Sequence, residues 1–196
     1  MLVVDQRATG DSDGNVISFG INERYDVLAW TQMITKRFPK MKIILVGGSL
    51  RAATVLMASE LDLPANVVGV VADSAYSSPK AIIKKVIDEM NLPATLTYPF
   101  VKLSAKILGH FNLEAASPIQ AVKNTKLPIL IVHGEDDHYV PCSMAYQNFN
   151  ACQSPTKMLL TVPKGPHDIS LLVDWDRYQS MVEQFFDKIG VPMKNK

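Results

Sequence analysis

One stretch of the chain decides its fold: Lys42-Ile43-Ile44-Leu45-Val46-Gly47-Gly48-Ser49-Leu50-Arg51-Ala52-Ala53-Thr54-Val55-Leu56. Its apolar first part is typical of a buried strand, and its small and aliphatic last part is typical of a helix. Two glycines and a serine lie between the two parts, which predicts a sharp turn with the Ser49 hydroxyl at its apex. The stretch therefore predicts a strand, a tight turn and a helix in succession.

The turn nearly matches the nucleophile-elbow pattern G-x-S-x-G, because residues 47–51 read Gly-Gly-Ser-Leu-Arg. In that pattern the last glycine leaves room for a strand and a helix that pass closely. We therefore expect Arg51 either to extend into solvent, to push the helix away and tilt Ser49, or to pair with a nearby carboxylate. The competing interpretation is that Ser49 only caps the helix.

Apolar segments of strand length alternate with helical patterns along the whole chain. This alternation predicts an α/β fold, with a mainly parallel sheet covered by helices on both faces and a single domain over residues 1–196. Strands are expected at residues 2–5, 42–46, 66–72, 127–132 and 157–162, and the last helix at about 169–189.

The segment between the third and fourth expected strands is unusually long. Residues 76–117 have a helical pattern that is interrupted by Pro79, Pro93 and Pro99. An insert of this length suggests a helical cap over a site, and an elaborated crossover without a functional role is the alternative.

Composition excludes several classes of function. The chain has 196 residues, 47% of them hydrophobic, and a net charge of +1, which gives no electrostatic reason to expect nucleic acid or an anionic membrane as partner. We expect a cytoplasmic protein with no membrane span, or the soluble part of a longer one. Cys142 and Cys152 are expected to be plain thiols, because two cysteines and four scattered histidines offer neither a disulfide framework nor a metal site.

Three residues with complementary chemistry follow expected strands in the order serine, aspartate, histidine: Ser49, Asp137 and His167. Carboxyl ends of parallel strands gather at one edge of a sheet, so these side chains are expected to meet there. Serine needs a base to become a nucleophile, and the histidine base needs a carboxylate to orient it. Asp136 and Asp73 are the alternative acids.

The histidines carry competing interpretations. His167 is the expected base, although a histidine in a loop also occurs without any function. His133 is expected to pack at the end of its strand, and His138 and His110 have no supporting context.

Four motifs in this order resemble those of the α/β-hydrolase superfamily, in particular its bacterial serine aminopeptidase-like, prolyl-oligopeptidase-like and fermentation–respiration-switch-like hydrolases. Residues 5–12 resemble the loop D-x-R-G-H-G-x-S, residues 47–49 the elbow, residues 133–141 the motif H-G-x-x-D-x-x-V-P, and His167 follows a proline as the family's histidine does. The resemblance implies a serine hydrolase that cleaves a carboxylic ester or related acyl compound without a cofactor. It also implies that the amide of Leu50 contributes to the oxyanion hole.

The resemblance also implies that about three strands are missing before residues 2–5, together with the loop that donates the second oxyanion amide. Losing one such donor typically lowers the rate about 10²–10³-fold. We expect residues 1–5 to move into the vacant place beside the strand at 42–46, or to leave strand edges unpaired and open to self-association.

Other functions compete with the esterase. A catalytically impaired or truncated homologue could serve as a binding or interaction module, and a peptidase or thioesterase would use the same triad. A nucleotide-binding protein is disfavoured, because no G-x-G-x-x-G follows any expected strand.

Overall fold

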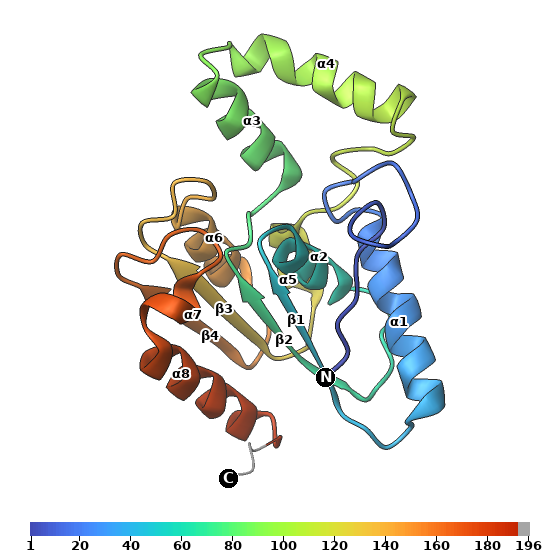
Figure 1. Ribbon diagram of the computed structural model, residues 1–196, viewed down its shortest axis with the longest axis vertical. Helices are drawn as coiled ribbons and strands as arrows, with labels where there is room; N and C mark the ends of the chain where they lie inside the picture. The colour runs from blue at the N-terminus through green and yellow to red at the C-terminus, as the bar shows by residue number, and fades with distance from the viewer. Residues whose placement is uncertain (192–196) are drawn as a thin grey trace.

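The computed structural model describes residues 1–191, and its centre is a parallel sheet of four strands. The strands lie side by side in chain order (Figure 1): β1 (Ile43–Gly48), β2 (Val67–Asp73), β3 (Ile129–Gly134) and β4 (Lys157–Val162). In the register of the first three strands, Leu45 pairs with Val70, which pairs with Ile129. All strands run in the same direction, so their carboxyl ends form one edge, as the sequence predicted.

Helices cover both faces of this sheet, which confirms the predicted layers. One face packs on helices that include α1, α2, α5 and α6, and the other packs mainly on α8. The helices are α1 (Glu23–Arg37), α2 (Leu50–Ala58), α3 (Pro79–Glu89), α4 (Ala94–Ile107), α5 (Pro118–Asn124), α6 (Ser143–Ala151), α7 (Ser170–Val173) and α8 (Trp175–Lys188).

The middle strands are apolar without alternation because both of their faces are buried. In β2, Val70 packs toward α2 whereas Val71 packs toward Phe185 of α8. The side chain of Phe185 is completely buried. Burying an aromatic ring of this size stabilises the fold by about 2–3 kcal/mol, so α8 is held firmly on its side of the sheet.

The prediction of a strand at residues 2–5 is wrong. The segment has no strand pairing, and Leu2 and Val3 are 56% and 75% exposed. The next residues form a turn-rich loop, and the Arg7 guanidinium ties this loop to Asp26 of α1. Within residues 1–191 the outer edge of β1 therefore pairs with no strand, which was the second of the two expected outcomes.

The helix expected at about residues 169–189 is divided at Asp174. Asp174 has non-helical dihedral angles, and its carboxylate accepts a hydrogen bond from the Arg177 amide (3.2 Å). This contact satisfies a backbone donor at the start of α8, so the chain begins a new helix there.

The predicted helical insert forms a hairpin of α3 and α4 that projects beyond the carboxyl ends of the strands (Figure 1). Pro79 is the first residue of α3, and the Ser78 hydroxyl accepts a hydrogen bond from the Ala81 amide (3.1 Å). Both features favour a helix start. Neither this hairpin nor any other described helix has the length and apolar character needed to cross a membrane.

Candidate active site

Ser49 lies at the apex of a strained turn between β1 and α2. Its φ of 54° is in the left-handed region, which costs a residue with a side chain about 1–3 kcal/mol. A Cβ on Gly47 would lie 2.5 Å from the backbone carbonyl of Arg51, so the strand and the helix pass too closely for any side chain there. The Ser49 amide donates to the carbonyl of Asp73 (2.8 Å), which fixes the turn to β2.

The turn accommodates Arg51 without losing this close approach. The arginine side chain is exposed, and no carboxylate lies within ion-pair distance of it among the described residues. Of the three expected outcomes, extension into solvent is therefore the one that the structure contains. The helix stays against Gly47, and Ser49 keeps its position.

His167 connects Ser49 with Asp137. The Ser49 Oγ lies 2.7 Å from His167 Nε2, and His167 Nδ1 lies 2.7 Å from Asp137 Oδ2. Ser49 occupies the N-cap position of α2, but its side chain makes no capping hydrogen bond to the helix and contacts His167 instead. The structure thus brings together the three residues that the order of motifs singled out.

Backbone hydrogen bonds connect the loop after β3, which carries Asp137, with the loop after β4, which carries His167. The Glu135 amide donates to the carbonyl of Val162, and the Asp136 amide donates to that of Gly165 (2.9 and 3.0 Å). A Cβ on Gly134 would collide with the backbone of Gly165. Glycine is needed at this position because the two loops touch through their backbones.

The side chain of Asp137 is completely buried, and both of its carboxylate oxygens have hydrogen-bond partners. Its Oδ1 accepts from the amides of Tyr139 and Val140 (3.0 and 2.7 Å), and its Oδ2 contacts His167 and also His133 (3.2 Å). Burial raises the pKa of Asp137, but the hydrogen bonds from His133, His167 and Val140 outweigh burial and hold the pKa below its ordinary value.

His133 is a member of the site that sequence reasoning missed. Its ring is completely buried, and its Nε2 lies between the carbonyl of Val140 (2.7 Å) and Asp137 Oδ2 (3.2 Å). Both of these groups are acceptors, so Nε2 carries the proton. The predicted packing at the strand end is correct, but the contact with the acid was not foreseen. Its only signal was the position at the start of H-G-x-x-D.

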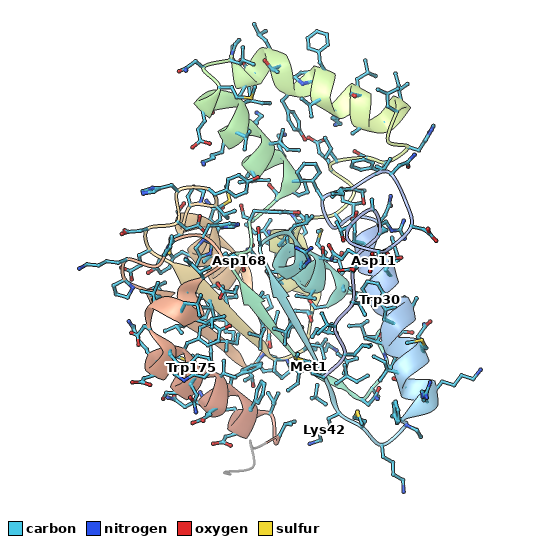
Figure 2. All side chains as sticks on the ribbon, in the orientation of Figure 1. Met1, Asp11, Trp30, Lys42, Asp168 and Trp175 are labelled. Carbon is cyan, nitrogen blue, oxygen red and sulfur yellow. The ribbon has the colours of Figure 1, made fainter. Side chains whose placement is uncertain are left out.

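Neither alternative acid reaches the histidine. The Asp73 carboxylate accepts from the hydroxyls of Ser74 (3.1 Å) and Ser170 (3.4 Å), and Asp136 is exposed. Burial raises the pKa of Asp73 above its ordinary value, and the nearby charge of Asp168 adds to this effect. Figure 2 marks Asp168 at the same edge of the sheet, and its amide donates to the Ser74 hydroxyl (3.1 Å).

The remaining candidates lie outside this network. His110 and His138 are exposed. Cys142 is partly buried and Cys152 is buried, both as free thiols, and burial raises the pKa of each. Leu50 is the first residue of α2, where the backbone amide has no acceptor within the helix.

The α3–α4 hairpin reaches the loop that carries the acid. Lys85 of α3 donates to the carbonyl of His138 (2.5 Å), and its ammonium lies 5.8 Å from the centre of the Tyr139 ring. The Tyr139 ring in turn lies 5.0 Å from the ring of His167. The hairpin is therefore in contact with the edge of the sheet where the candidate site lies.

A parallel sheet in chain order, helices that cover both of its faces and the turn at Ser49 define the α/β-hydrolase fold; within residues 1–191 the sheet has no strand beyond β1. Solved structures agree. An esterase of Pyrococcus furiosus, Pf2001, superposes with a TM-score of 0.69 at 23% identity, over 94% of this chain and 68% of the esterase. The α/β-hydrolase domain-containing protein 10 of mouse superposes with a TM-score of 0.62 at 20% identity, over 94% of this chain and 76% of the mouse protein.

Sequence comparison finds a more limited likeness. No family model matches the chain. The uncharacterized protein YqkD of Bacillus subtilis (strain 168) is 23% identical over 192 residues. This alignment covers 97% of the chain but 63% of YqkD, so the chain spans less than two thirds of that relative's length. At these identities the comparisons show the fold alone.

Proposed function

We propose that the chain is a serine hydrolase that cleaves a carboxylic ester or a related acyl compound. The observation that carries this proposal is the continuous hydrogen-bonded series from Ser49 Oγ through His167 to the buried Asp137 carboxylate. The series begins at a serine held in a strained turn at the carboxyl end of β1. Such a serine is exposed to a substrate and has its base already in contact.

In the proposed reaction, Ser49 Oγ attacks the acyl carbon while His167 Nε2 takes the hydroxyl proton. Asp137 holds the ring with Nδ1 protonated and stabilises the resulting imidazolium. The negative oxygen of the tetrahedral intermediate accepts a hydrogen bond from the Leu50 amide, and the positive end of α2 adds to this stabilisation. The intermediate expels the alcohol, which takes the proton from His167. Water then hydrolyses the acyl-enzyme by the same steps.

We propose further that the α3–α4 hairpin, within the insert at residues 76–117, is a cap that shapes the pocket for the acyl or alcohol group. The contacts from Lys85 to the acid loop support this role. A peptidase or thioesterase would use the same three residues, and the cap would decide among these substrates.

A second candidate function is a binding module derived from a hydrolase. It is favoured by the outer edge of β1, which has no strand partner within residues 1–191, where Val46 is 66% exposed. Such an edge offers backbone donors and acceptors to a strand of another chain, which includes a second copy.

Labelling with a fluorophosphonate, followed by mass mapping of the modified peptide, separates the two functions. The hydrolase requires labelling at Ser49, with loss of labelling in His167→Ala. His110→Ala is the matched control, because His110 is exposed and lies outside the network. A folded wild-type chain that stays unlabelled would contradict the hydrolase and favour the binding module.

A further inference from the structure

Helix α4 is apolar on two opposite faces, and only one of them is covered. Its inner face packs against α3 and the segment that follows α4. Its outer face carries Leu96, Phe100, Leu103 and Ile107, which are 67%, 72%, 52% and 57% exposed. Spacings of four, three and four residues place these side chains in one stripe along the helix. We call these four residues the outer stripe.

A stripe of this kind is unusual at a free surface. Scattered exposed apolar residues need no explanation, but a continuous row of large ones marks a place where something docks. Helix α4 is the outermost element of the hairpin, and side chains project from it away from the sheet (Figure 2). Leu92 before the helix and Leu108 after it are also exposed (44% and 73%).

Two lysines, Lys102 and Lys106, lie on one flank of α4, and the helix itself contains no acidic residue. Lys102 pairs with Glu114, which also contacts Lys80, whereas Lys106 has no acid within ion-pair distance among the described residues. Residues 79–114, which include the Glu114 carboxylate, contain five lysines and three acids and carry a charge of +2. Since the whole chain carries +1, the remaining residues carry −1. The near-neutral total therefore conceals an excess of positive charge in this segment.

We propose that the outer stripe docks on an anionic lipid surface. A helix with large aliphatic and aromatic side chains on one face and lysines beside them is the type that lies in the boundary between lipid headgroups and chains. The apolar side chains would enter this boundary while the lysines approach the anionic headgroups. This proposal departs from the expectation based on total charge, because the charge is unevenly distributed.

The observations favour lipid over a second copy of the chain. Two outer stripes packed face to face would place Lys106 of both copies in one interface, and α4 has no acid to pair with it. Stable protein interfaces also use about 20–30 residues on each side. The outer stripe and its two neighbours supply far fewer.

Docking in this way would bring the candidate site close to the lipid, because α3 contacts the loop of Asp137 through Lys85. The proposal goes beyond hydrolysis and does not depend on it, since vesicle binding is measured without a reaction. A chain that binds vesicles but does not label at Ser49 would contradict only the proposed hydrolase.

The test is flotation of the protein with vesicles of phosphatidylcholine alone and of phosphatidylcholine with 30% phosphatidylglycerol. We expect binding to the anionic vesicles, weakened at high salt. Phe100→Ser combined with Ile107→Ser is expected to lower the partition coefficient at least about tenfold, because each side chain loses apolar burial. Lys106→Gln is expected to lower it about fivefold.

Met33→Ser combined with Phe38→Ser is the matched control, because these side chains are 56% and 46% exposed but lie on or next to α1. The control is expected to bind like the wild type. Absence of vesicle binding, or binding that the Phe100 and Ile107 substitutions leave unchanged, would overturn the proposal. So would a concentration-dependent dimer in light scattering that these substitutions abolish, since the stripe would then cover a second copy.

Discussion

Two aspartates close to the same edge of the sheet have nearly equal solvent exposure, but their pKa values are shifted in opposite directions. Asp73 ends β2 and Asp137 follows β3, and the two residues are 6% and 5% exposed. The pKa of Asp137 is lowered, whereas that of Asp73 is raised. Burial opposes the charged form in both cases, but at Asp137 the hydrogen bonds from His133, His167 and Val140 outweigh it.

The difference lies in the hydrogen-bond donors. Asp137 is held by two backbone amides and two histidine rings, whereas Asp73 receives only two hydroxyls and lies near the negative charge of Asp168. Hydrogen bonds to the charged form lower the pKa of a carboxyl group, and Asp137 receives more of them than Asp73 does. Of these two carboxylates, the one whose loop folds back and supplies backbone amides is the one with the lowered pKa.

The largest expected effect is on hydrolysis. Asp137→Asn should lower kcat/KM for an activated ester about 10⁴-fold, because an amide at this place favours the wrong tautomer of His167. Asp73→Asn should stay within about threefold, since Ser49 is tied to the backbone of Asp73 and not to its side chain. Steady-state assays of both variants measure this difference in kcat/KM. An equal loss of kcat/KM in both would contradict the distinction between the two aspartates.

Next in size is the effect of His133 on stability. His133→Leu removes a donor to buried Asp137 and leaves the carbonyl of Val140 without its partner, which should cost about 2–3 kcal/mol. Urea unfolding measures this loss. His138→Leu, at an exposed position, should change stability by less than about 0.5 kcal/mol. If the two variants were equally stable, the contact between His133 and the acid would not stabilise the fold.

The two acids should also have opposite effects on stability as pH changes. The folded pKa of Asp73 lies above its ordinary value of 3.8, so its ionisation destabilises the fold increasingly as pH rises through the folded pKa. Asp73→Asn should therefore raise the melting temperature at pH 7, with the gain vanishing below about pH 3.8.

The folded pKa of Asp137 lies below 3.8, so its ionised form stabilises the fold above that pH, and the contribution is lost as pH falls through the folded pKa. Asp137→Asn should lower the melting temperature at pH 7 and approach the wild type in acid. Thermal unfolding across pH 3–8 measures both variants. Curves that shift in the same direction would refute the assignment of opposite pKa shifts.

The smallest effect is expected at Arg51, the charged residue at the last position of the elbow pattern. Because its side chain extends into solvent, Arg51→Ala should change kcat/KM by less than about threefold and stability by less than about 0.5 kcal/mol. Gly47→Ala is the informative counterpart, since a methyl group there would clash with α2. A large loss in Arg51→Ala would mean that the arginine contributes to the site directly.

Much of the fold followed from local patterns. The strands expected at 66–72 and 157–162 agree closely with β2 and β4. A short valine-rich or aliphatic run that is bounded by turn residues is typical of a buried strand. The meeting of Ser49, Asp137 and His167 was also predictable, since each follows a strand and parallel strands end at one edge.

The features that could not be predicted from the sequence depend on contacts between residues that are brought together only by the fold. Residues 2–5 have the composition of a strand, but a strand needs a partner, and no local pattern tells whether one is within reach. The role of His133 was hidden for a similar reason, because only the turn at residues 137–140 brings Asp137 back beside it. Arg51 replaces the last glycine of the G-x-S-x-G pattern, but its side chain extends into solvent and leaves the turn unchanged.

The backbone of Ser49 has a consequence for any attempt to engineer this protein. Its φ of 54° suits glycine better than any residue with a side chain. Ser49→Gly would relieve strain worth about 1–3 kcal/mol and at the same time delete the hydroxyl. Thermostability and the candidate active site therefore compete for one position. Selection by heat alone would favour Ser49→Gly and so discard the site, and a screen for stable variants needs a parallel measurement of labelling at this serine.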